Sequence, residues 1–211
     1  MIRTRNIGWN ANLLFKKRSL PLLSNSPKRS DPMKTLQLGA AAALLSLAAA
    51  AAHAADYSFI AGKDFQQFSR TPQGLGLGLS IDYLNSDHKG NAGGAGLEFA
   101  IPLGPVTLAG GGKLMSLNPD SGSGTAALLG GRANIQLAPK VSLYGQAYYA
   151  GDSMASGSVK NVSDLAAGVR WNPIGPFTVE AGYRYFDIER KDGNRNRRLA
   201  DGMYIGAGFT F

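Results

Sequence analysis

The sequence feature that most restricts the fold is a two-residue alternation of apolar side chains with small or polar ones. The segment GLGLGLSIDYL (residues 74–84) has leucine, isoleucine or tyrosine at every odd position from 75 to 83, and glycine, serine or aspartate between them. Successive side chains of a β-strand point to opposite sides of a sheet, so this pattern predicts a strand with one apolar face.

The same alternation predicts seven more strands. It is clear at residues 95–103, 141–150, 164–171, 177–186 and 203–211, and looser at 106–117 and 125–137. Upstream, DYSFIAG (56–62) also alternates, and FQQFSR (65–70) can pair with it as a short hairpin. An even number of strands returns both ends of the chain to one side of a sheet or barrel. We therefore predict ten strands, with eight as the alternative.

The connectors between these segments alternate in length. PLGP, APK and NPIGP are short and contain proline, whereas the stretches at 85–92, 118–124, 151–161 and about 190–202 are longer and polar. Aromatic residues of the apolar face fall near both strand ends, with Trp171 and Phe177 at one end and Tyr83, Tyr149 and Tyr185 at the other. Short turns on one side, long loops on the other and two aromatic rings are typical of a transmembrane antiparallel up-and-down β-barrel in a bacterial outer membrane.

The N-terminal segment carries most of the net charge of +8. Residues 1–54 hold eight lysines and arginines and one aspartate, a net charge of +7. The remainder is nearly neutral, which argues against a general nucleic-acid surface. Residues 33–54 combine a lysine, an apolar run and the triplet Ala52-His53-Ala54. This predicts an exported protein with a cleaved signal peptide. We interpret residues 1–32 as an unfolded upstream extension and residues 55–211 as the barrel.

The inward face of such a barrel should carry any chemistry. Alternation places four acidic and four basic side chains there, and in a barrel of this size side chains fill the interior. Enclosed charges must be paired, so we predict a structural ion-pair network that plugs the lumen, with a narrow path for water or small solutes as the alternative. The predicted members are Asp82, Glu98, Lys113, Arg132, Asp164, Arg170, Glu180 and Arg184. Inward glycines would make room for the arginines.

Motifs for catalysis or cofactor binding are weak. The glycine runs at 74–80 and 110–116 lack the full phosphate-loop pattern, and residues 192–197 lack the glycine and terminal acid of a calcium loop. His88 is the single histidine after residue 54, with Ser86 and Asp87 as neighbours. A lipid-modifying enzyme built on this histidine is the second alternative. We predict no catalytic residue, metal or cofactor.

A dense basic stretch lies in the last predicted loop. Charge-assisted bonds from these side chains to lipopolysaccharide phosphates are a candidate interaction. The residues are Arg190, Lys191, Arg195, Arg197 and Arg198. The chain also ends on an aromatic residue, Phe211, which resembles the C-terminal signal that the barrel assembly machinery reads in bacterial barrel proteins.

Four stretches carry a family resemblance: SLYGQAYYAGDS (142–153), AGVRWNPIGP (167–176), EAGYRYFDIERKDGNR (180–195) and LADGMYIGAGFTF (199–211). They resemble the YfaZ family of outer-membrane proteins. The resemblance implies a signal peptide, a glycine-rich barrel and an outer-membrane location. The family has no established activity, so no functional residue is carried over. We predict a small envelope barrel that is not an enzyme.

Overall fold

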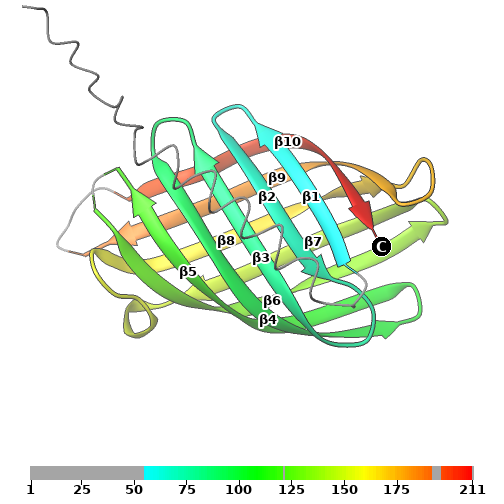
Figure 1. The fold of residues 1–211 in the computed structure, drawn as a ribbon, viewed down its shortest axis with the longest axis horizontal. Coiled ribbons are helices and arrows are strands. Elements are labelled where there is room, and N and C mark those ends of the chain that lie inside the picture. The colour runs from blue at the N-terminus through cyan, green and yellow to red at the C-terminus, as the bar shows by residue number, and fades with distance from the viewer. Residues whose placement is uncertain (1–54, 121, 192–195, 211) are drawn as a thin grey trace, which may run out of the picture. The chain divides into compact units, whose positions relative to one another are not determined.

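The computed structural model describes residues 55–120, 122–191 and 196–210. These residues form one closed antiparallel barrel in which each strand pairs with its neighbours in sequence and β1 closes against β10 (Figure 1). The expected leader segments, 1–32 and 33–54, and Phe211 lie outside the described residues. The elements are β1 (Ala55–Gly62), β2 (Phe65–Pro72), β3 (Gly76–Ser86), β4 (Gly90–Leu103), β5 (Val106–Pro119), β6 (Gly124–Ala138), β7 (Val141–Ala150), the 3-10 helix η1 (Asp152–Met154), β8 (Val159–Trp171), β9 (Phe177–Arg190) and β10 (Arg197–Thr210).

The prediction of ten strands is confirmed, and the alternative of eight is wrong. Strand β2, whose alternation is poor, pairs with β1 and β3 over most of its length. Its phenylalanines are three residues apart, so they point to opposite sides. Phe65 is buried in the barrel interior, whereas Phe68 pairs with Phe59 on the outward face. Backbone pairing therefore makes a strand here without a regular apolar pattern.

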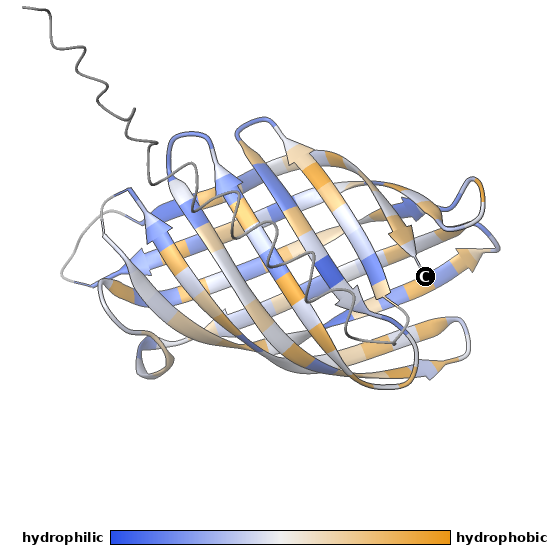
Figure 2. Ribbon diagram, viewed as in Figure 1, coloured by the Kyte–Doolittle hydropathy of each residue, from blue (hydrophilic) through white to orange (hydrophobic). Residues whose placement is uncertain are grey.

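An apolar belt surrounds the barrel. Many large apolar side chains on the outward face are exposed, among them Leu77 at 60% and Val169 at 45%. Figure 2 shows the corresponding alternation of hydrophobic and hydrophilic residues along the strands. So much exposed apolar surface is incompatible with water but fits contact with lipid chains. Among the described residues, no helix has the length and apolar character needed to span a bilayer.

The barrel has two unlike ends. The start of β1 and the end of β10 meet at one end, together with the turns that follow β2, β4, β6 and β8; we call this the turn end. The opposite end carries the remaining connectors, and we call it the loop end. Phe177 and Phe209 contact each other on the outward face at the turn end, with ring centroids 4.8 Å apart.

The predicted long loop at residues 85–92 is wrong. β3 continues to Ser86 and β4 begins at Gly90, with the register unbroken up to the pair Ser86 and Gly90, so three residues make the turn. Likewise β5 extends to Pro119 and β8 already begins at Val159. Strand pairing uses backbone groups and needs no apolar side chain, so polar sequence continues the sheet beyond the apolar belt.

Candidate functional site: the barrel interior

The barrel interior has three parts along its axis. Apolar side chains fill the loop end, charged side chains fill the middle, and a polar cavity opens at the turn end. We call these the apolar layer, the charged layer and the turn-end cavity. The alternation correctly gives the strand faces, but it does not predict that the inward face is apolar at one end.

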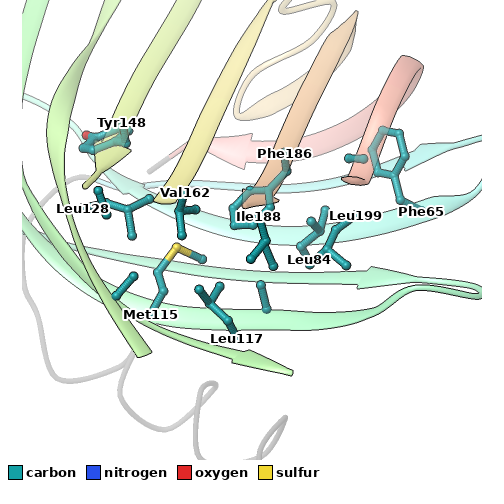
Figure 3. Close-up of a cluster of buried hydrophobic side chains, with 14 of the residues drawn as sticks. Phe65, Leu84, Met115, Leu117, Leu128, Tyr148, Val162, Phe186, Ile188 and Leu199 are labelled. Carbon is teal, nitrogen blue, oxygen red and sulfur yellow. The ribbon is translucent and has the colours of Figure 1, made fainter. Parts of the chain in front are cut away.

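The apolar layer comes from side chains on opposite walls of the barrel. Figure 3 shows them converging from several strands. Leu84, Leu117 and Leu128 are at most 1% exposed, as is Phe186 across the lumen. The full buried cluster, of which Ile60 and Tyr204 reach into the middle of the lumen, is Ile60, Phe65, Leu84, Ala92, Met115, Leu117, Ala126, Leu128, Tyr148, Ala150, Val159, Val162, Phe186, Ile188, Leu199, Ala200 and Tyr204. These side chains make the described inward face of the barrel apolar at the loop end.

The first ion-pair group of the charged layer joins strands β3 to β6. Lys113 Nζ lies 2.7 Å from Asp82 Oδ2 and 3.9 Å from Glu98 Oε1. Arg132 Nε donates to Glu98 Oε2 at 2.6 Å, and the same guanidinium also donates to the Pro72 carbonyl. The Glu98 side chain is fully buried. Each cation therefore compensates a carboxylate that is removed from water.

The second group joins β8 and β9. Arg184 donates to Asp164, and both side chains are almost completely buried. Gln146 Nε2 of β7 also donates to Asp164 Oδ1, at 3.1 Å. Both donors reach Oδ1, and the buried Oδ2 has no hydrogen-bond partner among the described protein atoms.

The third group lies nearer the turn end and includes a residue that the sequence analysis missed. Arg170 Nη1 lies 2.5 Å from Asp56 Oδ2 of β1, and Arg170 Nη2 lies 2.9 Å from Glu180 Oε2. Thr210 Oγ1 donates to the other oxygen of Asp56 at 3.0 Å. Asp56 occupies an inward position of the predicted strand 56–62, so the alternation could have identified it.

All eight predicted residues point inward, and the structure brings them together in three separate groups. With Asp56, these groups contain five carboxylates and four cations, instead of the predicted four of each.

Two inward glycines make room for tyrosines, not for arginines as predicted. A Cβ atom at Gly168 would lie 2.8 Å from the Tyr144 hydroxyl, and one at Gly182 would lie 2.9 Å from the Tyr204 hydroxyl. These two hydroxyls hydrogen-bond to each other across the lumen. The Tyr144 ring also lies against Arg170, with its centroid 5.0 Å from Cζ. Glycine therefore allows aromatic side chains to cross a narrow interior.

The turn-end cavity has a volume of about 200 Å³. Its polar lining includes Asn134, Gln136, Ser142 and Thr210 on the strands and Lys140 in the β6–β7 turn. Arg170 forms part of its inner wall and also borders a smaller cavity of about 60 Å³ in the middle of the lumen. The turn-end cavity is thus a polar recess that reaches the charged layer at Arg170.

The structure does not place the described glycine runs or His88 in a site with the geometry of catalysis. The glycine runs lie largely within β3 and β5 and not in a loop before a helix. His88 is exposed in the β3–β4 turn, while Ser86 Oγ donates to the Asp64 carbonyl at 3.2 Å. Most of the calcium-like loop, at 192–195, lies outside the described residues. In the described part of the chain, no three His, Asp or Glu side chains are placed to share a metal ion.

The basic stretch near the loop end is interleaved with acids. Arg198 lies 3.0 Å from Asp201 and stacks over the Tyr185 ring at 5.6 Å. Lys191 lies 3.1 Å from Asp152. Arg190 and Arg197 also interact with other groups, and Arg195 lies outside the described residues. The described cations here are therefore engaged within the protein.

Comparison with known proteins gives one family. A family model described as YfaZ precursor matches residues 33–211. The Outer membrane protein YfaZ of Escherichia coli (strain K12) is 36% identical over 182 residues, which cover 85% of this chain and 100% of that protein. Among solved structures, NanC porin has a TM-score of 0.44 at 12% identity, covering 76% of this chain and 100% of its own. KdgM porin in complex with oligogalacturonate has a TM-score of 0.39 at 14% identity, covering 75% and 99%.

A closed antiparallel barrel with an apolar belt outside and paired charges inside defines a small outer-membrane β-barrel protein. The family match and the related sequence also identify the family. This chain belongs to the YfaZ family, and it is a protein of the bacterial outer membrane. Short turns of such barrels lie in the periplasm and longer loops outside, which predicts that the turn end faces the periplasm and the loop end faces the medium.

Proposed function

We propose that the protein is a closed, structural barrel of the outer membrane, neither a pore nor an enzyme. The apolar layer carries this proposal, because it fills the lumen at the external end with side chains that cannot solvate an ion. Hydrophobic constrictions stop conduction by excluding water even where some space remains. The buried ion pairs beneath it add a second obstruction.

Conductance in planar lipid bilayers tests the closed state. Purified protein comprising residues 55–211 is expected to give no conductance steps. The double variant Leu117→Ala/Phe186→Ala shortens apolar side chains on two walls and is expected to give small, frequent steps. Leu97→Ala on the lipid-facing side of β4 is the matched control and should stay silent. Conductance steps from the wild-type protein, as large and frequent as those of the double variant, would refute the closed state.

A narrow water channel is the second candidate, and the two polar cavities that share Asn134 and Arg170 favour it. Together they have room for several waters, since one water needs about 10–15 Å³ of such space. The apolar layer interrupts this path before it reaches the external end. Stopped-flow osmotic shrinkage of proteoliposomes separates the candidates. A rate above that of empty liposomes favours the channel.

The absence of enzymatic activity belongs to the same proposal. The exposed turn position of His88 and the backbone bond of Ser86 give no nucleophile activated by a base. We expect the lipid A profile of cells that carry His88→Ala to equal that of cells with the wild-type protein. A change in acylation or phosphorylation that disappears with this substitution would establish an enzyme.

The proposal includes two partners in the envelope. Arg198 is about half exposed near the external end of β10, where its guanidinium could also reach a lipopolysaccharide phosphate. Arg198→Gln is then expected to weaken retention of lipopolysaccharide on the purified barrel. If Arg198→Gln retains as much lipopolysaccharide as the wild-type protein does, the proposed contact is wrong. The barrel assembly machinery is the second partner, through Phe211.

A further inference from the structure

The closed-barrel proposal assigns no role to the turn-end cavity, which opens to the periplasm. Its volume of about 200 Å³ exceeds the roughly 150 Å³ of a cavity that holds benzene. A six-membered ring with substituents therefore fits in it. A barrel that only had to be sealed could have filled this end with side chains, as it does at the external end.

The lining of the cavity is selective in its chemistry. Amide and hydroxyl side chains, including Gln136, Ser142 and Thr210, line it together with the cations Lys140 and Arg170. The described lining residues include no carboxylate. Amides and hydroxyls both donate and accept hydrogen bonds, which suits a ligand rich in hydroxyl groups. Arg170 is already paired with Asp56 and Glu180, so Lys140 is the cation of the described lining that suits a ligand with a negative charge.

Two polar groups of the lining have unused hydrogen-bonding capacity. Asn134 Oδ1 is buried and has no hydrogen-bond partner among the described protein atoms. A buried acceptor in this state gains free energy when a hydroxyl donates to it. Lys140 Nζ donates to the Pro173 carbonyl at 2.9 Å, and an ammonium has two more N–H groups to offer. That bond holds Lys140 at the rim of the cavity.

From this geometry we propose that the turn-end cavity binds an anionic monosaccharide from the periplasm, one that carries a carboxylate or a phosphate. Lys140 pairs with the anionic group at the rim, and Asn134 accepts a hydrogen bond from a ring hydroxyl. Arg170 lies at the inner wall of the cavity. Its guanidinium already pairs with Asp56 and Glu180, so it does not bind the anionic group of the ligand. The ligand enters and leaves on the same side of the membrane.

Calorimetric titration of the folded protein, residues 55–211 in detergent, tests this site. The probes are D-glucuronate, D-glucose 6-phosphate and D-glucose, with potassium acetate as a probe without hydroxyls. We expect saturable binding of at least one sugar anion. Glucose, which lacks the anionic group, and acetate, which lacks the ring hydroxyls, should each bind about tenfold or more weakly, because each loses hydrogen bonds that the sugar anion makes. Comparing the two anions shows whether carboxylate or phosphate is preferred. Trp171, the single tryptophan after residue 54, gives a second readout by fluorescence.

Two variants locate the ligand. Lys140 is exposed in a turn, so the Lys140→Gln variant should fold normally. We expect this variant to bind both sugar anions about tenfold or more weakly and to bind glucose as the wild type does. Asn134→Ala should weaken the binding of all three sugars. Lys63→Gln, in the exposed β1–β2 turn at the opposite end, is the matched control and should bind as the wild type does.

The site is refuted if the wild-type protein binds neither sugar anion saturably, or if Lys140→Gln keeps wild-type affinity for both. Glucose binding as tightly as glucuronate and glucose 6-phosphate would refute the role of charge. Conductance is measured on the same protein. A silent barrel without sugar binding overturns this inference alone, whereas a conducting barrel that binds the sugar overturns the closed state alone.

Discussion

The substitution Arg184→Met removes the guanidinium that compensates Asp164 in the charged layer. The Asp164 side chain is fully buried and keeps only the neutral Gln146 amide as its described donor. Removing one partner of a buried ion pair costs about 3–5 kcal/mol because an uncompensated charge remains. That cost lowers the folding equilibrium constant by roughly two to three and a half powers of ten at 1.4 kcal/mol per tenfold change.

The matched double variant Arg184→Met/Asp164→Leu removes both charges and restores an apolar contact. Replacing a buried pair by apolar residues of similar volume is often neutral or stabilising, so the double variant should recover most of the lost free energy. Urea unfolding in lipid vesicles, followed by Trp171 fluorescence, gives the free energy of unfolding of each protein. A loss under about 1 kcal/mol for Arg184→Met, or additive losses in the double variant, would show that the pair is not coupled.

Three further predictions concern packing, lipid contact and assembly. Gly168→Ala should destabilise the barrel by about 1–3 kcal/mol in urea unfolding, because its Cβ would lie 2.5 Å from the Ala181 carbonyl oxygen. Gly145→Ala, on the lipid side, is the control and should be nearly neutral, since its Cβ would lie 3.7 Å from the nearest carbonyl oxygen. Ala181→Arg, midway along the lipid-facing side of β9, should cost about 2–4 kcal/mol in the same assay, and equal stability would contradict the assignment of this face. Deletion of Phe211 should lower the amount of heat-modifiable barrel in cell envelopes but leave refolding from urea into detergent unchanged; a loss in both would point to a structural role instead.

Alternation predicts the faces of the strands because one side chain in two must contact lipid. It predicts that Leu77 points outward and Glu98 inward, as the structure has them. It does not predict the apolar layer, because apolar residues on both faces, as around Phe186, erase the pattern. Nor does alternation predict which charged side chains pair across the lumen. Asp56 meets Arg170 only because β1 closes against β10, and that closure depends on the register of all ten strands.

The positions of Arg170 and Lys140 determine how the proposed anionic ligand would bind at the rim of the turn-end cavity. Arg170 with Asp56 and Glu180 forms a group of net charge −1, which repels an anion from the charged layer. Lys140 lies at the rim of the same cavity, where the described lining residues include no carboxylate that would cancel its positive charge. An anionic ligand is therefore attracted to the mouth and stopped at the inner wall. In the proposals made above, the apolar layer closes the lumen and Lys140 binds the anion at the rim, so we expect a substitution at Lys140 to weaken binding without opening the lumen.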